Sequence, residues 1–202
     1  MTDRVVVIFV EGDTEVVFYK RLVAHIREKH NGRLSCKVEY KNLKGIGNYK
    51  KGALSYIRKS IIPKYIDAKI TILLCHDTDV FEFSTNPPVN WENVQKGLVS
   101  LEKVDRVELI KAKRSIENWF LLDRMGILRF LKLPLDTKSQ GDGLEEMKRL
   151  FRKVNKVYIK GNVTNDFVPH LNIELITSAI CNEIKPLCKA LGMNCKTPIC
   201  KP

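Results

Sequence analysis

Two unbroken apolar runs stand out in the pattern of hydrophobic and polar positions along the chain. Residues 4–10 (RVVVIFV) and 69–77 (KITILLCHD) are rich in β-branched and aliphatic residues and show almost no alternation with polar ones. Such runs are typical of strands that are buried on both faces of a sheet. Residues 106–112 predict another strand, and residues 36–43 predict a more exposed one because polar and apolar positions alternate there.

Helical periodicity fills the intervals between these strands. After the first run, Phe18, Leu22 and Ile26 lie four residues apart, which predicts a helix that ends before Gly32. The pattern also predicts one more short strand at 157–161 and helices at about 51–62, 91–103, 115–131 and 171–191. Strands that alternate with helices predict an α/β fold with a mainly parallel sheet flanked by helices.

One segment suggests a division of the chain. Residues 134–143 (PLDTKSQGDG) form its most flexible-looking stretch, which is either the edge of a core domain or an exposed lid. A chain of 202 residues is long enough for one good hydrophobic core. We therefore expect a core domain over 1–133 and a C-terminal, α-rich extension over 134–202 that packs on it. The alternative is that the extension completes the same domain.

Charge, hydropathy and cysteine spacing indicate which binding partners and which compartment to expect. The chain has 35 Lys and Arg against 23 Asp and Glu, a net charge of +12 that favours polyanions such as nucleic acid. It has no apolar run of the roughly 18 residues that span a bilayer and no signal-peptide pattern at its start, so we expect a cytoplasmic protein without a membrane partner. The six cysteines are irregularly spaced and predict neither a disulfide framework nor a zinc site.

Acidic residues follow both buried strands at the point where each strand ends. Glu11 and Gly12 come directly after the first strand, and Asp77 and Asp79 come at the end of the later one. In an open α/β sheet this edge is where ligands bind, and the two groups of acids meet there if their strands are neighbours. Because Asp77 and Asp79 are two residues apart on an extended segment, they point the same way and are able to bind one divalent cation or two adjacent ones.

Two other interpretations of these acids stay open at this stage. In the first, Asp13 or Thr14 caps the following helix and the D-T-D sequence is a solvated turn. In the second, the strand ending in D-x-D belongs to a haloacid-dehalogenase-like phosphatase with a nucleophilic first aspartate. Such enzymes also need an acidic pair at a later strand end, and the second half of this sequence contains none.

The two acidic motifs and their spacing resemble the Toprim domain of the OLD-like and RloB-like nuclease group. The segment VEGDTEVVFYKRLV (10–23) is similar to the V-E-G-x-[S/T]-E opening of that group, and SIENWFLLD (115–123) is similar to its I-E-x-W-L-L-x-D segment. The resemblance covers residues 4–123 well and the remainder weakly. It implies a Rossmann-like Toprim fold and a metal-dependent nuclease.

The resemblance also implies roles for individual residues. The implied metal ligands are Glu11, Glu15, Asp77, Asp79 and Glu117. The implied catalytic residues are Glu11 as a general acid or base, Asp77, Asp79, and Lys160 as a group that stabilises phosphate charge. The implied cofactors are two Mg²⁺ or Mn²⁺ ions, which such oxygen ligands suit and which together clamp a scissile phosphate.

Basic residues bracket the expected site in the sequence. The candidates for contact with nucleic acid are Lys44, Lys50, Lys51, Lys113 and Arg114. These side chains neutralise phosphates, and the sequence shows no base-reading motif beside them, so we expect recognition of the backbone or of its shape.

Together these features predict a Toprim-type endonuclease that cleaves DNA or structured RNA such as tRNA, as an effector of prokaryotic antiphage defence. The chain has no G-x-x-x-x-G-K-[S/T] motif, so a controlling ATPase would be a separate partner. Both a monomer and a homodimer are compatible with the sequence. The alternative function is a catalytically inactive module that binds nucleic acid or acts as an adaptor in a defence complex.

Overall fold

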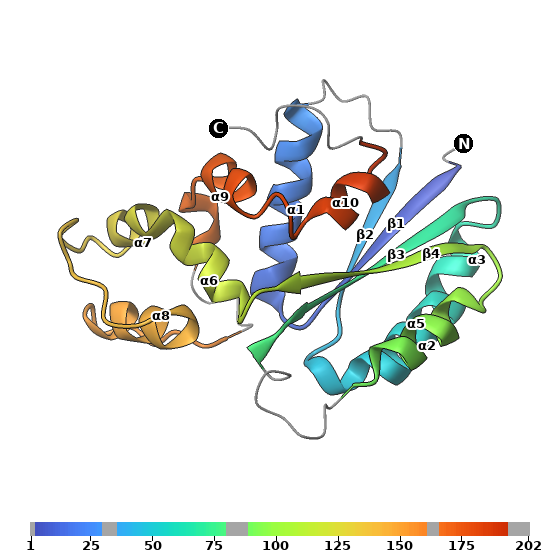
Figure 1. Cartoon of the computed structure of the whole chain (residues 1–202), viewed down its shortest axis with the longest axis horizontal. Coiled ribbons are helices and arrows are strands. Elements are labelled where there is room, and N and C mark those ends of the chain that lie inside the picture. The colour runs from blue at the N-terminus through green and yellow to red at the C-terminus, as the bar shows by residue number, and fades with distance from the viewer. Residues whose placement is uncertain (1–2, 30–35, 80–88, 161–165, 194–202) are drawn as a thin grey trace.

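A parallel sheet of four strands forms the centre of the molecule (Figure 1). The computed structural model describes residues 3–29, 36–79, 89–160 and 166–193. The strands are β1 (Arg4–Val10), β2 (Lys37–Asn42), β3 (Lys69–Asp77) and β4 (Val104–Ala112), in the spatial order β2-β1-β3-β4. Helices flank the sheet, so the predicted α/β, Rossmann-like fold is confirmed.

The two buried strands of the sequence are neighbours in the sheet. β1 pairs with β3 in parallel, with Phe9 opposite Leu74, and β2 and β4 add to the outer sides of this pair. Because all pairs are parallel, the carboxyl ends of the four strands lie at one edge. The residues that follow β1 and β3 therefore start from adjacent positions.

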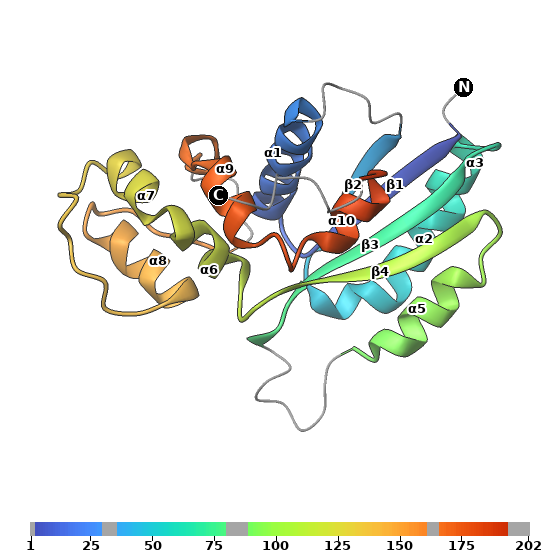
Figure 2. The same cartoon turned by 45° about the horizontal axis from the view of Figure 1, so that its top comes forward.

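Each face of the sheet has its own hydrophobic core, which explains the unbroken apolar runs. Val6, Ile8 and Val10 pack with α1 (Asp13–Lys29) and α10 (Lys185–Ala190) on one face. The alternate β1 residues, such as Val7, pack on the other face with α5 (Trp91–Val99) and the helical segment after β2. Figure 2 shows α1 and α10 on the opposite side of the sheet from α2 (Leu54–Tyr56) and α5.

The helical segment after β2 has unusually wide turns. It comprises η1 (Ile46–Asn48), the π-helix η2 (Tyr49–Ala53), α2 (Leu54–Tyr56), the π-helix η3 (Ile57–Ile61) and α3 (Ile62–Lys64). Its buried residues recur every four positions, at Tyr49, Ala53, Ile57 and Ile61. An α-helix has 3.6 residues per turn and a π-helix has more. A segment that combines the two therefore has close to four residues per turn, which places these four buried residues on the same side.

The remaining helices gather beyond the carboxyl end of β4 in both views. They are α6 (Ile116–Phe120), η4 (Leu121–Asp123), α7 (Arg124–Phe130), α8 (Gly143–Arg152), η5 (Val168–His170) and α9 (Ile173–Ala179). The hydrophobic cluster that includes Phe120 also includes Phe151 and Phe167, and the rings of Phe120 and Phe167 have centroids 5.3 Å apart. Residues before and after position 133 thus share one hydrophobic cluster. The predicted division of the chain into two parts at residue 133 stays a prediction.

Four predictions about local structure are wrong. Residues 157–160 belong to no strand, with Lys160 in a turn, and 161 lies outside the described residues. The single helix expected at 171–191 is instead α9 and α10, because Pro186 lies in the first turn of α10, where its missing N–H costs no hydrogen bond. The helix expected at 115–131 is interrupted where Asp123 caps α7 by accepting a hydrogen bond from Gly126 N at 3.0 Å. Cys181 forms a disulfide, which the cysteine spacing does not predict.

Among the helices of the described residues, none is both long and apolar enough to cross a membrane.

We expect Tyr49→Phe to lower the free energy of unfolding by about 1–3 kcal/mol, the cost of leaving a buried polar group without its partner. The Tyr49 hydroxyl lies between the ends of β1 and β3, 3.4 Å from the carbonyl oxygen of Phe9 and hydrogen-bonded to that of Cys75. Urea unfolding measures the change. The control is Tyr56→Phe, which keeps the edge-on ring contact with Phe9. Equal stability of the two variants would contradict this prediction.

Candidate active site

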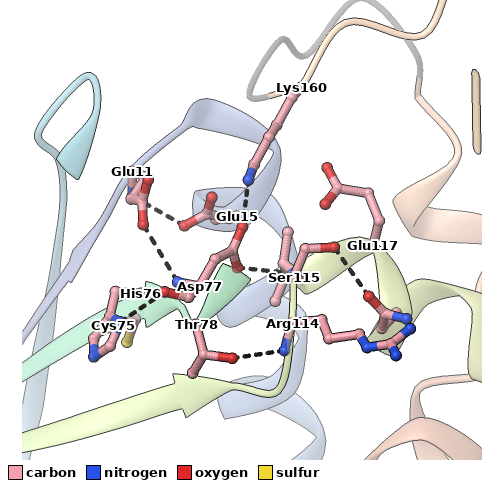
Figure 3. Close-up of polar contacts among 12 residues, drawn as sticks. Glu11, Glu15, Cys75, His76, Asp77, Thr78, Arg114, Ser115, Glu117 and Lys160 are labelled. Carbon is pink, nitrogen blue, oxygen red and sulfur yellow. Dashed lines mark hydrogen bonds and ion pairs between the residues drawn. The ribbon is translucent and has the colours of Figure 1, made fainter. Parts of the chain in front are cut away.

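The sheet brings the two acidic motifs together at its carboxyl edge. Glu11 follows β1, Asp77 ends β3, and Glu11 Oε1 accepts a hydrogen bond from the backbone N–H of Asp77 at 3.3 Å. Asp77 is almost completely buried, whereas Glu11 is half-buried. In Figure 3 both carboxylates face the same space above the strand ends.

Two further acids reach this space from helix N-termini. Glu15, in the first turn of α1, is buried, and its Oε2 accepts a hydrogen bond from Glu11 N at 2.9 Å. Glu117, in the first turn of α6, is completely buried, and its Oε1 accepts a hydrogen bond from the Tyr158 hydroxyl at 3.0 Å. Its other oxygen, Oε2, is buried without a hydrogen-bond partner among the described residues. We call Glu11, Glu15, Asp77 and Glu117 the acid cluster.

Lys160 supplies a positive charge to the acid cluster. Its ammonium group forms an ion pair with Asp77 Oδ2, and Figure 3 shows it reaching Asp77 from the side opposite the sheet. Burial alone would lower the pKa of Lys160, but the hydrogen bond and charge of Asp77, together with the charge of Glu117, raise it above its ordinary value. Lys160 therefore stays protonated and acts as a counter-ion.

One lysine does not fully compensate for the burial of the acids. Burial raises the pKa of Asp77 to about 7, even though Lys160 opposes the shift. Burial also raises the pKa of Glu11, and it raises the pKa of Glu15 well above its ordinary value, with a further contribution from the charge of Asp77. Raised values in a cluster of carboxylates mean that additional positive charge would be bound favourably there.

Asp79 does not continue the strand as expected. β3 ends at Asp77, and the backbone N–H groups of Thr78 and Asp79 both donate to the carbonyl oxygen of Arg114, at 3.0 and 2.9 Å. This pairing bends the chain, so the predicted extended D-x-D geometry is wrong. Asp79 is half-buried, and its charge still helps to raise the pKa of Glu11, after burial as the main cause.

The donor atoms of the acid cluster fit a hard divalent cation. Carboxylate oxygens are the ligands that Mg²⁺ and Mn²⁺ prefer, and the buried Oε2 of Glu117 has no described partner. No group of three His, Cys, Asp or Glu side chains in the described ranges is already arranged as a metal site. The ammonium group of Lys160 lies where a cation would neutralise Asp77, so binding a metal there requires Lys160 to move.

A cleft of about 590 Å³ opens beside the acid cluster. Besides Glu11, Glu15 and Lys160, it is lined by Gly12, Asp13, Asn42, Lys44, Gly45 and Ile159. Asp13 is the first residue of α1 and accepts a hydrogen bond from Asn42 Nδ2 at 2.7 Å, so it connects α1 with the end of β2. The cleft therefore lies over β1 and β2.

Sequence reasoning missed two residues of this site. Asn42 ends β2 at the ligand-binding edge, which is the signal that would have identified it. Tyr158, the partner of Glu117, lies two residues before Lys160, and both side chains reach acids of the cluster. Its nearness to Lys160 in the sequence V-Y-I-K-G is the signal that would have identified it.

The predicted nucleic-acid contacts separate into two groups. Lys44 lines the cleft, and Lys50 and Lys51 are exposed at the start of the helical segment 49–64. Lys113 and Arg114 are exposed after β4, and the Arg114 guanidinium forms an ion pair with Asp142. Part of the positive charge expected after β4 is therefore already neutralised within the protein.

We expect the free energy of unfolding of the metal-free protein to fall as the pH rises from about 4 through 7. The folded pKa of Asp77, about 7, exceeds its ordinary value of 3.8, so the folded state holds a proton that the unfolded chain has released. This stabilisation is complete below pH 3.8 and is lost as the pH rises through about 7, at up to about 1.4 kcal/mol per pH unit for one proton.

Urea unfolding in the presence of a chelator, at about pH 5 and pH 8, measures this dependence. Asp77→Asn should make the decrease with pH smaller. The control is Glu92→Gln, which changes an exposed acid paired with Lys96 on α5. If wild type and Asp77→Asn lose stability equally between the two pH values, Asp77 is not protonated in the folded state.

Comparison with known proteins gives no independent identification of this site. No family model, curated protein or solved structure matches the chain.

Proposed function

We propose that the protein is a metal-dependent nuclease of the Toprim type that cleaves phosphodiester bonds in DNA or structured RNA such as tRNA. The observation that carries the proposal is the acid cluster. Four carboxylates, which follow β1, end β3 and begin α1 and α6, converge at the carboxyl edge of a parallel sheet, where one lysine among the described residues compensates for their charge. A cluster of this kind has little use in stability alone, because buried unpaired carboxylates destabilise a fold.

The metal ligands in this proposal are Glu11, Asp77 and Asp79, with Glu15 and Glu117 completing a site for a second ion. Bound Mg²⁺ or Mn²⁺ would supply Lewis-acid stabilisation of the charge that develops on a phosphate during attack by water. Glu11 is suited to accept the proton from that water, since it is half-buried, lines the cleft and has a pKa raised by burial.

Lys160 has two roles in this proposal. In the metal-free protein its ammonium group neutralises Asp77. With Asp77 held by a bound cation instead, Lys160 would bind a non-bridging phosphate oxygen in the adjoining cleft, which it also lines. A lysine suits such a change of partner because its charge sits on a flexible four-carbon chain.

We further propose that the protein acts in the cytoplasm, in prokaryotic antiphage defence, together with a separate ATPase. The support is the similarity of its motifs to those of the OLD-like and RloB-like group.

Purified protein should cleave DNA or RNA in the presence of Mg²⁺ or Mn²⁺ and not in the presence of a chelator. Glu11→Gln and Asp77→Asn should each reduce cleavage by more than the roughly 10–100-fold that loss of an outer-shell partner costs a metal site. Gel assays with plasmid DNA and with total tRNA measure this, and Glu92→Gln on α5 is the control. If the wild type cuts neither substrate with either metal, the inactive binding or adaptor module becomes the better description.

Lys160→Met should lower the melting temperature of the metal-free protein and increase its stabilisation by Mn²⁺. The variant removes the positive charge beside Asp77, so the acids destabilise the fold until a cation binds. Differential scanning calorimetry across a Mn²⁺ titration measures both effects, and the exposed Lys153→Met is the control. An unchanged or weaker response to Mn²⁺ would show that the metal and Lys160 do not compete for one position.

A further inference from the structure

A long basic segment of the chain begins beside the cleft. Between Glu39 and Asp67 the sequence contains seven Lys and Arg residues and no acid, although the chain as a whole has 23 acids among 202 residues. The seven basic residues are Lys41, Lys44, Lys50, Lys51, Arg58, Lys59 and Lys64. They cover the end of β2 and the helical segment 49–64.

The wide helical turns align the basic residues of this segment. From Tyr49 to Ile61 every fourth residue is buried, which means that the segment has about four residues per turn. Two residues that are eight positions apart therefore lie on the same side, two turns from each other. Lys50 and Arg58 are eight residues apart, and so are Lys51 and Lys59, and all four are exposed. They form two parallel rows on the solvent side, about 12 Å long at the α-helical rise of 1.5 Å per residue.

These rows start at the site and lead away from it. The hydrogen bond from Tyr49 to Cys75 fixes the beginning of the segment at the carboxyl ends of β1 and β3. Lys44, five residues earlier, lines the cleft itself. Figures 1 and 2 show the segment running from this edge, past α2 and α3, along the face of the sheet opposite to α1.

Five of the seven basic residues are available for an outside partner. Lys64 forms an ion pair with Glu39 at 2.6 Å, and Lys41 lies over the ring of Tyr56, 5.0 Å from its centroid, so these two have partners within the protein. The other five form no ion pair with another described residue. An exposed cluster of like charges repels itself, and a polyanion relieves that repulsion.

We propose that Lys44, Lys50, Lys51, Arg58 and Lys59 form a phosphate-binding track that holds the backbone of a nucleic acid and directs it into the cleft from the β2 side. The track gives affinity without base selection, because exposed side chains that follow the outside of a helical segment bind the phosphate backbone and four of the five are lysines, which act as point charges. Lys113 and Arg114, on the β4 side and partly neutralised by Asp142, take no part in it. The choice of nucleic acid as the polyanion rests on the proposed function, but the track concerns binding and does not require cleavage.

Equilibrium binding in a chelator separates this inference from catalysis. The probes are fluorescent duplexes of about 20 base pairs, one of DNA and one of RNA, and anisotropy is measured at several salt concentrations. Lys50→Gln/Lys51→Gln and Arg58→Gln/Lys59→Gln should each weaken binding to every sequence tested. Each should also reduce the slope of log K against log salt by roughly one for each phosphate contact removed.

Two double variants with the same change in net charge serve as controls. Lys185→Gln/Lys189→Gln changes exposed residues of α10, on the other face of the sheet, and Lys113→Gln/Arg114→Gln changes the β4 side. Both should retain the wild-type slope, and melting temperatures verify that all four proteins are folded. If the track variants and the controls lose affinity and slope equally, only the net charge matters and the track does not exist.

A wild-type protein that binds neither duplex would also overturn the inference. The two proposals fail separately. A protein that binds through the track but cleaves nothing with Mg²⁺ or Mn²⁺ refutes the nuclease and leaves the track. A protein that cleaves equally well with the track neutralised refutes the track and leaves the nuclease.

Discussion

The carboxylate of Asp77 is the interaction on which the arrangement of the site depends. Its Oδ1 accepts a hydrogen bond from Ile116 N at 2.8 Å, which fixes the start of α6, and its Oδ2 binds Lys160. Its own backbone N–H donates to Glu11. One buried residue at the end of a central strand thus connects the neighbouring strand, the helix that carries Glu117 and the segment that carries Lys160. Because burial opposes its charge, this connection holds only while its partners remain in place.

Negative and positive charges are concentrated in different places in this protein, with a cluster of acids in the site and basic residues on the surface. The protein has a formal charge of +12, yet Glu15, Asp77 and Glu117, three of the five acids that are buried among the described residues, lie together at one edge of the sheet. The basic excess lies outside, on exposed helical positions such as Lys50 and Arg58. A polyanion is thereby attracted by the surface but repelled at the centre of the site, unless a cation is bound there. The exposed basic residues therefore account for long-range attraction of a polyanion, and the buried acids account for the local chemistry.

Much of this fold is predictable from the sequence, because strands buried on both faces leave unbroken apolar runs. The adjacency of β1 and β3 explains why Glu11 and Asp77 meet, and the strand-end rule was enough to expect it. Features set by tertiary contacts were not predictable. The bend at Asp79 depends on the carbonyl group of Arg114, and the ion pair of Lys160 joins residues 83 positions apart. No local pattern encodes contacts of that kind, and the helix break before Pro186 was missed although its cause is visible in the sequence.

The segment that carries Tyr158 and Lys160 has a consequence for how the fold can be divided. Both side chains return from the C-terminal part of the chain to acids of the N-terminal part, one to Glu117 and one to Asp77. A fragment ending at residue 133 would keep every acid of the cluster and lose both of these partners. The part of the sequence that carries the motifs is therefore not sufficient for a stable site. Recombination that exchanged the C-terminal parts of related proteins would have to preserve this tyrosine and this lysine.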